Sequence, residues 1–338
     1  MPFEIVRNDI TNMRVDAIVN TANPQPVIGL GVDSTIHDKA GPALLEARQK
    51  IGCIDMGSAA VTPAFHLHAK YVIHTVGPVW KGGSDGEEAF LCNCYDNSLK
   101  LALQYDCESI AFPLISTGNY GFPKDKALQI AISAFSRFLM EHEMQIYPVV
   151  FDQKAYKLSE KLFQDVATYI DQNYVDAWEV ATYGSVEPVR TRRSRGYTRA
   201  ESKAMTPMAC ESLAAPMDLD GFLKKKDAGF VETLLELIQK SGQKNSTIYK
   251  RANISKQHFS KLINDPKATI TKPVAVALAL ALELDLEATR DLIGRAGYTL
   301  TNSSYFDLVI QFHIEKKQYN VVQINCVLYE YDQTLLGS

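Results

Sequence analysis

The sequence lacks a long apolar segment. Its longest apolar run, Pro273–Leu284, is shorter than the roughly 20 residues that a membrane-spanning helix needs. The first ten residues also lack the basic and then apolar layout of a secretory signal. We therefore expect a cytoplasmic protein without a membrane partner.

A dominant charge and a cysteine framework are also lacking. The 35 Lys and Arg residues face 39 Asp and Glu residues, which leaves a formal net charge of −4. Nucleic acid or anionic lipid would therefore need a local basic patch. The six cysteines are scattered, and Cys92-x-Cys94 has no second pair at the spacing of a zinc site. We expect reduced thiols, no metal site and no resident cofactor.

The length of the chain indicates more than one domain. It has 338 residues, 46% of them hydrophobic, and single cores stop growing near roughly 250–300 residues. We predict a first domain over residues 1–175, a flexible basic linker over residues 176–223 and a mainly helical domain over residues 224–338. The linker prediction rests on a stretch rich in small and polar residues, with arginines at positions 190, 192, 193, 195 and 199.

Short β-branched runs alternate with longer amphipathic stretches in the first domain. The expected strands are Phe3–Val6, Ala17–Asn20, Ala59–Thr62, Tyr71–Val76, Ser109–Phe112 and Ile146–Phe151. The expected helices are Asp33–Lys50, Glu87–Tyr105, Lys124–Glu141 and Lys154–Asn173. This alternation predicts an α/β fold with helices on both faces of a mixed or mostly parallel sheet.

Two glycine-bearing loops leave predicted strands and lead into predicted helices. The first lies within Ile18–His37 and carries Gly29 and Gly31, and the second lies within Ala111–Pro123. Glycine lets backbone amides approach a ligand closely, and a helix start favours negative charge. Two such loops at the carboxyl ends of neighbouring strands could hold a diphosphate. Neither loop matches the P-loop or GxGxxG pattern, so ATPase and hydride-transfer chemistry are not supported.

Asp33 stands where the helix after the first loop should begin. An aspartate at that position is a good N-cap, because its side chain can accept from the first unpaired amides of the helix. Taken alone, this structural role is the favoured interpretation of Asp33.

Four sequence blocks, in order, carry a resemblance to a known family. They are NDITNMRVDAIVNTAN, GLGVDSTIHDKAGPALLEA, AAVTPAFHLHAKYVIHTVGPVW and FPLISTGNYGFP. Together they cover nearly all of residues 1–173 and resemble a macrodomain of the MacroD-like branch. The resemblance implies a three-layer α/β/α fold with a central mixed sheet. It also implies binding of ADP-ribose, and its hydrolysis from acidic side chains or deacetylation of O-acetyl-ADP-ribose.

The resemblance also implies a role for each matching residue. Asp9 and Ile10 would bind the adenine amino group, and Phe151, with Asp152 beside it, would stack on the adenine ring. Asn23 would bind the distal ribose. The diphosphate and the ribose would be surrounded by residues of the two loops: Gly29, Gly31, Val32, Ser116, Thr117, Gly118, Asn119, Tyr120, Gly121 and Phe122.

Asp33 and Asn23 are the catalytic residues that the resemblance implies. Asp33 would position, and help to activate, the water that attacks the anomeric carbon or the acetyl ester. Asn20 would bond across the loop and so belongs to the site in a structural role. His37 and His74 are better explained as satisfied structural histidines.

The first loop departs from the pattern of the family. The usual four glycines read Ile28-Gly29-Leu30-Gly31 here, so two glycines are replaced by large apolar residues. Asn8 also stands in place of a glycine before Asp9. Leu30 could narrow the cleft around the phosphate or cover it from water, which bears on turnover rate and substrate choice.

The second domain contains a stretch with the rhythm of a helix-turn-helix, STIYKRANISKQHFSKLIND. The pattern places Ile248, Tyr249 and Ala252 inward, a turn at Asn253–Ile254, and a second helix opened by Ser255. In outline it resembles phage-repressor-like domains. Its exposed candidates for contact would be Ser255, Lys256, Gln257 and His258.

Basic residues are in local excess around this stretch. Between positions 244 and 272, Asp265 is the one acidic residue, and the basic residues are Lys244, Lys250, Arg251, Lys256, Lys261, Lys267 and Lys272. A nucleic acid or a protein could bind through residues 244–272, although solvated charge runs are common and three-helix bundles that bind proteins share the spacing.

The leading hypothesis is a cytoplasmic, bacterial hydrolase of ADP-ribosyl esters with a helical module that supplies a partner or location. A first alternative is a sensor that binds ADP-ribose-type ligands without turnover. A second is a regulator in which the helical domain binds DNA and the first domain senses the ligand.

Overall fold

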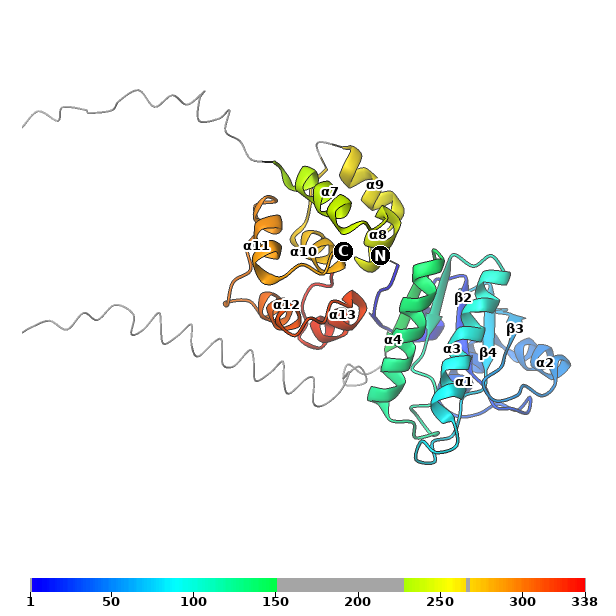
Figure 1. The fold of residues 1–338 in the computed structure, drawn as a ribbon. Coiled ribbons are helices and arrows are strands. Elements are labelled where there is room, and N and C mark those ends of the chain that lie inside the picture. The colour runs from blue at the N-terminus through cyan, green and yellow to red at the C-terminus, as the bar shows by residue number, and fades with distance from the viewer. Residues whose placement is uncertain (1, 151–227, 266–267, 338) are drawn as a thin grey trace, which may run out of the picture.

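The computed structural model describes residues 2–150, 228–265 and 268–337. Residues 2–150 form an α/β unit, the N-terminal unit, and the remaining described residues form the helical unit (Figure 1). The predicted domain boundaries, the predicted helix Lys154–Asn173 and the predicted ligand residues Phe151 and Asp152 lie outside the described residues.

The N-terminal unit is built on a sheet with the strand order β1-β6-β5-β2-β4-β3. Neighbouring strands are parallel, except that β3 pairs antiparallel with β4. The predicted mixed sheet is confirmed, although the first strand begins later than expected because Phe3 makes only an isolated bridge to Ile146. The strands are β1 (Val6–Arg7), β2 (Ala17–Thr21), β3 (Ala59–Pro63), β4 (Tyr71–Thr75), β5 (Ser109–Phe112) and β6 (Gln145–Val150).

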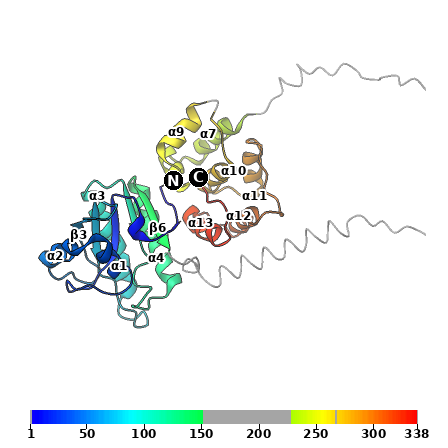
Figure 2. The same cartoon turned by 180° about the vertical axis from the view of Figure 1, so that it is seen from behind.

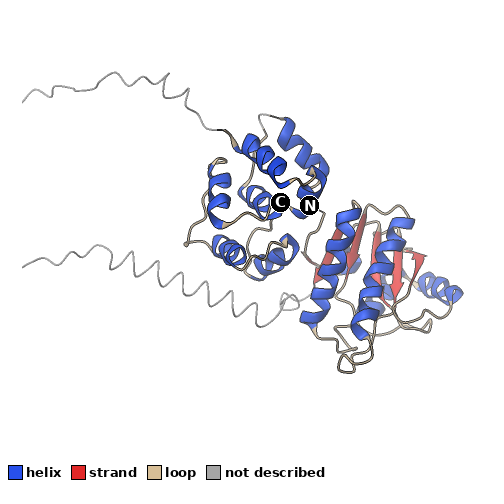
Figure 3. Ribbon diagram, viewed as in Figure 1, coloured by secondary structure: helices blue, strands red, loops and turns tan. Residues whose placement is uncertain are grey.

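Helices cover both faces of this sheet, as Figure 3 shows for α3 and α4 on one face. Strand side chains alternate between the faces, so Val19 and Ile73 pack in the apolar cluster of α3 and α4. Ile18 and Val72 pack in the cluster of the opposite face, which includes Ile36 of α1. The three-layer arrangement is therefore confirmed, with helices α1 (Val32–Ala40), α2 (Pro42–Ile51), α3 (Glu87–Gln104) and α4 (Lys124–Glu141).

The prediction of one helix over Asp33–Lys50 was wrong. The structure breaks this stretch at Gly41, whose φ of 85° is incompatible with a continuing right-handed helix. Pro42 then opens α2, at a first-turn position where a missing amide proton costs nothing.

The helical unit confirms a mainly helical second region, and two of its helices, α8 and α9, cover the stretch with the predicted helix-turn-helix spacing. Ile248 and Ala252 are fully buried, and Asn253 makes the turn with a φ of 56°. Ser255 caps the second helix, since its hydroxyl accepts from the His258 amide. The helices are α7 (Phe230–Ser241), α8 (Asn245–Arg251), α9 (Lys256–Asn264), α10 (Lys272–Ala281), α11 (Leu286–Gly294), α12 (Tyr305–Glu315) and α13 (Val321–Glu330). In the described ranges, no helix combines the length and the apolarity that a membrane crossing requires.

The two units meet where both ends of the chain come together, as Figures 1 and 2 show from opposite sides. The buried Asn253 side chain accepts from the Phe3 amide and donates to the Phe3 carbonyl, both at 2.9 Å. It also donates to the carbonyl of Leu336 at 3.4 Å. The α8 side chains Tyr249 and Lys250 add bonds to Glu143 and to the Met140 carbonyl. One asparagine in the helix-turn-helix turn thus ties together the two ends of the described chain.

We predict that Asn253→Ala lowers the free energy of unfolding by roughly 2–4 kcal/mol. The change leaves two buried backbone groups of Phe3 unpaired and places alanine at a positive φ. Urea unfolding followed by circular dichroism measures the effect. Asn264→Ala is the matched control, because Asn264 is exposed and bonds only within α9. Equal effects of the two substitutions would contradict the prediction.

Candidate functional site

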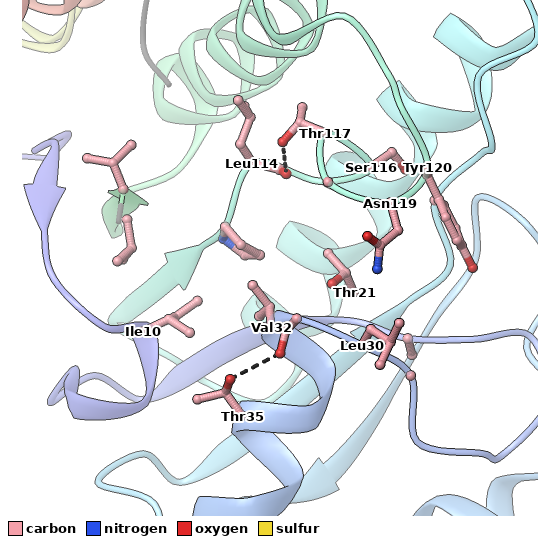
Figure 4. Close-up of a pocket in the computed structure, with 18 of the residues that line it drawn as sticks. Ile10, Thr21, Leu30, Val32, Thr35, Leu114, Ser116, Thr117, Asn119 and Tyr120 are labelled. Carbon is pink, nitrogen blue, oxygen red and sulfur yellow. Dashed lines mark hydrogen bonds between the residues drawn. The ribbon is translucent and has the colours of Figure 1, made fainter. Parts of the chain in front are cut away.

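A cavity of about 590 Å³ opens at the carboxyl ends of β1, β6, β5 and β2 (Figure 4). Because β2 and β5 are paired and parallel, the loops that follow them lie next to each other. We call these loops the Gly29 loop (residues 22–31) and the Gly118 loop (residues 113–123). The cavity is lined by Asn8, Asp9, Ile10, Thr21, Ala22, Asn23, Gly29, Leu30, Gly31, Val32, Thr35, Gly77, Pro113, Leu114, Ser116, Thr117, Gly118, Asn119, Tyr120, Lys124, Val149 and Val150.

The Gly29 loop keeps glycine where the backbone requires it. Gly31 has a φ of 71°, and a Cβ on Gly29 would lie 2.9 Å from Nδ2 of Asn23. Gly31 is the N-cap residue of α1 and supplies no capping side chain. The first amides of α1 are therefore open to an anion at this wall of the cavity.

The Gly118 loop forms the opposite wall in a strained conformation. Ser116 has a φ of 63°, unusual for a residue other than glycine, and its carbonyl is held by the Phe122 amide. Gly77 leaves room for this conformation of the loop, since a Cβ on Gly77 would lie 2.1 Å from Oγ of Ser116. Lys124, the first residue of α4, also lines the cavity and brings a positive charge to this wall.

The two ends of the cavity differ in chemistry. Ile10 lies at one end and Tyr120 at the other (Figure 4). Beside Ile10, the Asp9 carboxylate caps the short 3-10 helix Ile10–Asn12. At the other end, the Tyr120 hydroxyl donates to Oδ1 of Asn23 at 3.3 Å. The backbone of Asn23 is fixed in turn by the buried guanidinium of Arg48, which donates to its carbonyl.

Asp33 lies beneath the Gly29 loop and is not part of the cavity wall. Its side chain is only 2% exposed, and its two carboxylate oxygens accept from the Gly29 amide and from Nδ2 of Asn20. The N-cap interpretation was wrong, because α1 begins at Val32 and Asp33 bonds back to Gly29 outside the helix. The carboxylate therefore anchors the loop. The predicted water-positioning role remains a prediction.

Two buried histidines complete this network. The His74 ring contacts Nδ2 of Asn20 and the Thr62 hydroxyl at 3.1 and 2.9 Å. Burial, together with a smaller effect of the nearby Arg48 guanidinium, lowers the pKa of His74 to about 3. Burial also lowers the pKa of His37, against the opposing effect of Asp33, which lies 3.6 Å away. Both rings are neutral at physiological pH, as expected of structural histidines.

Most of the predicted ligand residues lie together in the cavity. The structure places in its wall Asp9, Ile10, Asn23, Gly29, Gly31, Val32, Ser116, Thr117, Gly118, Asn119 and Tyr120. Asn20, Asp33, Gly121 and Phe122 lie outside the wall. For Phe122 the predicted contact with ribose was wrong: its ring is 2% exposed and packs edge-on against Trp80.

Sequence reasoning missed several lining residues, of which Lys124 and Gly77 are the most informative. Lys124 opens the helix after the second loop, and a basic residue at that position is a readable signal for an anion site. Gly77 lies two residues after the end of β4. It must be a glycine because Ser116 approaches it closely, and this contact is visible only in three dimensions.

The helical unit presents a second, open cavity of about 1320 Å³ between α9 and the N-terminal unit. The exposed Lys256 and Gln257 line it, opposite Asp16, Glu108 and Glu143 at the amino ends of the strands. Carboxylates on the facing wall disfavour a polyanion there.

Several members of the basic run also have structural partners. Arg251 pairs with Glu283 at 2.9 Å, and Lys272 pairs with the buried Asp307 at 2.6 Å. Binding of nucleic acid or protein through residues 244–272 stays a prediction. Across the described ranges, no group of three or more His, Cys, Asp or Glu side chains is arranged to hold a metal ion.

Known proteins match about half of this chain or less, and the family match lies in the N-terminal unit. The model of the family described as "Macro domain" matches residues 19–131. A "Macro domain-containing protein" of Methanosarcina mazei is 46% identical over 166 residues, which are 48% of this chain and 89% of that protein. The "O-acetyl-ADP-ribose deacetylase" of Escherichia coli K12 is also 46% identical over 166 residues, 47% of this chain and 94% of that protein.

Among solved structures, the chain is similar to the Oceanobacillus iheyensis macrodomain with ADP. The two are 37% identical, the match covers 49% of this chain and 92% of that chain, and the TM-score is 0.45.

The buried histidine network predicts a pH dependence of stability. In the unfolded chain His74 takes up a proton near pH 6.5, whereas in the folded protein it resists protonation down to about pH 3. Stability is therefore complete above pH 6.5 and falls as the pH drops toward 3. Between pH 6.5 and 5 the free energy of unfolding of the natural chain falls, and we expect His74→Gln to make this fall smaller by about 1–2 kcal/mol. Urea unfolding across this range measures the effect, and His68→Gln is the control because His68 is exposed. An unchanged pH dependence of the free energy of unfolding in His74→Gln would refute the prediction.

Proposed function

Since the chain belongs to the Macro domain family, we propose that its N-terminal unit binds ADP-ribose and hydrolyses ADP-ribosyl esters. The substrates are O-acetyl-ADP-ribose, proteins carrying ADP-ribose on acidic side chains, or both. The names of relatives such as the Escherichia coli O-acetyl-ADP-ribose deacetylase support this proposal.

One observation carries the proposal: two amide-rich loops face each other across a single elongated cavity. Its volume, about 590 Å³, is within the range of roughly 300–1,000 Å³ typical of small-molecule sites. The start of α1, the Gly118 loop and Lys124 supply amides and a positive charge midway along the cavity. Such a centre suits a diphosphate, with a nucleoside on one side and a second sugar on the other.

The differing ends of the cavity support one orientation of the ligand. The adenine lies beside Asp9 and Ile10, whose carboxylate and amide can accept from and donate to the base edge. The distal ribose lies at the other end, beside Asn23 and Tyr120, where a side-chain amide and a hydroxyl meet. The ester bond is then next to Asn23, a polar side chain of the cavity wall that can orient a water molecule.

The proposed reaction needs one water and no redox partner. With O-acetyl-ADP-ribose, the water oxygen bonds to the acetyl carbonyl carbon, and the bond from that carbon to the ribose oxygen breaks. The ribose oxygen takes up a proton, and the products are acetate and ADP-ribose. With a modified acidic side chain, the water attacks the anomeric carbon and the carboxylate leaves. Orientation of the water inside a closed site supplies the rate gain.

We assign Asp33 to this reaction as a positioning residue. Its carboxylate holds the Gly29 amide and the Asn20 side chain, so it sets the shape of the loop that receives the diphosphate. Loss of the carboxylate would leave the Gly29 amide without this acceptor and would leave Nδ2 of Asn20 with the His74 ring as its remaining partner. In this account Asp33 supports ligand binding as well as turnover, whereas a residue that only positions water would support turnover alone.

We predict that the intact chain releases acetate from O-acetyl-ADP-ribose and binds ADP-ribose. Asn23→Ala should lower kcat/KM by roughly 10- to 100-fold, as expected for loss of a hydrogen bond to the reacting end. Chromatography of ADP-ribose measures release, and calorimetry measures binding. Asn12→Ala, an exposed asparagine near the adenine end, is the control.

A second prediction separates the two roles of Asp33. We expect Asp33→Ala to weaken ADP-ribose binding at least about 10-fold and to lower hydrolysis with it. Asp38→Asn is the matched control, because Asp38 is an exposed residue of the same helix. Retained binding with lost hydrolysis would assign Asp33 to the water instead. Binding by the natural chain without release from either substrate class would make the protein a sensor.

A further inference from the structure

The three most exposed large apolar side chains in the described ranges belong to one loop. They are Leu30, Val27 and Ile28, at 78%, 59% and 46% exposure. All three belong to the Gly29 loop, and Leu30 also lines the cavity. Isolated exposed apolar residues are ordinary, but a leucine that is the most exposed of them and also lines the wall of a binding site points to a contact made with a ligand.

The backbone explains why side chains are tolerated at these positions. A Cβ on Gly29 would collide with the side chains of Asn23 and Asp33, and Gly31 has a positive φ. Neither position can therefore carry a side chain without strain. Ile28 and Leu30 are both exposed, so their side chains meet no such restriction. Leucine at position 30 therefore adds apolar surface to the cavity without disturbing the amides that face the diphosphate.

Leu30 lies toward the Tyr120 end of the cavity. Figure 4 shows it below Asn119 and across from Tyr120, away from Ile10 at the opposite end. The neighbouring residue, Gly29, is packed against Asn23. This apolar side chain is thus placed beside the end of the site where the distal ribose would carry its ester.

The distal ribose itself offers mainly hydroxyl groups and a few C–H groups at this end, so it gives leucine little apolar surface to cover. An ester on that ribose does offer such a group, namely the alkyl part of its acyl chain. We propose that Leu30 determines acyl specificity, and that the protein prefers ADP-ribose esters of acyl groups longer than acetyl, such as propionyl and butyryl. The inference rests on the proposed function and names its substrate class.

The reaction is the same ester hydrolysis with a longer acyl group. The water oxygen bonds to the acyl carbon, the bond from this carbon to the ribose oxygen breaks, and the ribose oxygen takes up the proton. The products are ADP-ribose and propionate or butyrate. Leu30 takes no part in the bond changes and acts by covering the alkyl chain.

The test compares kcat/KM for O-acetyl-, O-propionyl- and O-butyryl-ADP-ribose with the intact chain. Burial of one methylene favours binding by up to about four-fold, so we expect a rise of about two- to four-fold for each added carbon. Leu30→Ser should flatten this series, and Leu30→Met should restore it, because methionine returns apolar surface at the same place. Ile28→Ser is the matched control, since Ile28 is an exposed apolar residue of the same loop outside the cavity wall.

The possible outcomes separate the inference from the proposed function. Hydrolysis of the acetyl ester with an equal or falling rate for longer esters, or the same series in Leu30→Ser, would overturn the inference alone. Hydrolysis of none of the esters would overturn the proposed function. In that case calorimetry with amide analogues of the three esters decides: affinity that rises with chain length and is flattened by Leu30→Ser supports the role of Leu30, and equal affinities overturn it.

Discussion

The site depends on one buried carboxylate. Asp33 holds the Gly29 amide and the Asn20 side chain at once, and Asn20 continues to the His74 ring and from there to Thr62. A loop with two prolines and two glycines has no regular hydrogen-bond ladder of its own. This chain of buried bonds replaces that ladder and ties the loop to strands β2, β4 and β3. A charge in such a place is stable only while its partners stay in position.

The same sheet serves two separate surfaces. The cavity lies at the carboxyl ends of the strands, whereas Asp16, Ser109 and Gln145, at the amino ends, face α9 of the helical unit. The helical unit therefore packs on the fold without covering the cavity. Its attachment through Phe3 lies a few residues before Asn8, at the edge of the cavity. The chain therefore runs from the contact with the helical unit at Phe3, through β1, to the Ile10 end of the cavity.

Much of this fold could be predicted because its signals are local. Short β-branched runs predicted the strands, and glycines after neighbouring strands predicted loops that meet at one edge. The features that were missed depend on contacts made outside the regular elements. The Asp33 carboxylate bonds to the Gly29 amide and to the Asn20 side chain, and the Phe122 ring packs against Trp80. A local pattern contains neither.

In the helical unit, too, the local sequence did not reveal the partners of the charged side chains. Its basic run indicated a surface for a polyanion, yet Arg251 and Lys272 are paired with Glu283 and Asp307, acidic residues that lie outside the run. Local counting of charge could not reveal these partners. The inward positions and the Ser255 cap of α9 were predictable, since both are local features.

The central claim is that the two loops hold the diphosphate of ADP-ribose between them. A crystal structure of the intact chain with ADP-ribose tests it most directly. We expect the diphosphate between the start of α1 and the Gly118 loop, the adenine beside Asp9 and Ile10, and the distal ribose beside Asn23. A ligand bound in the reverse direction, or bound outside this cavity, would contradict the account.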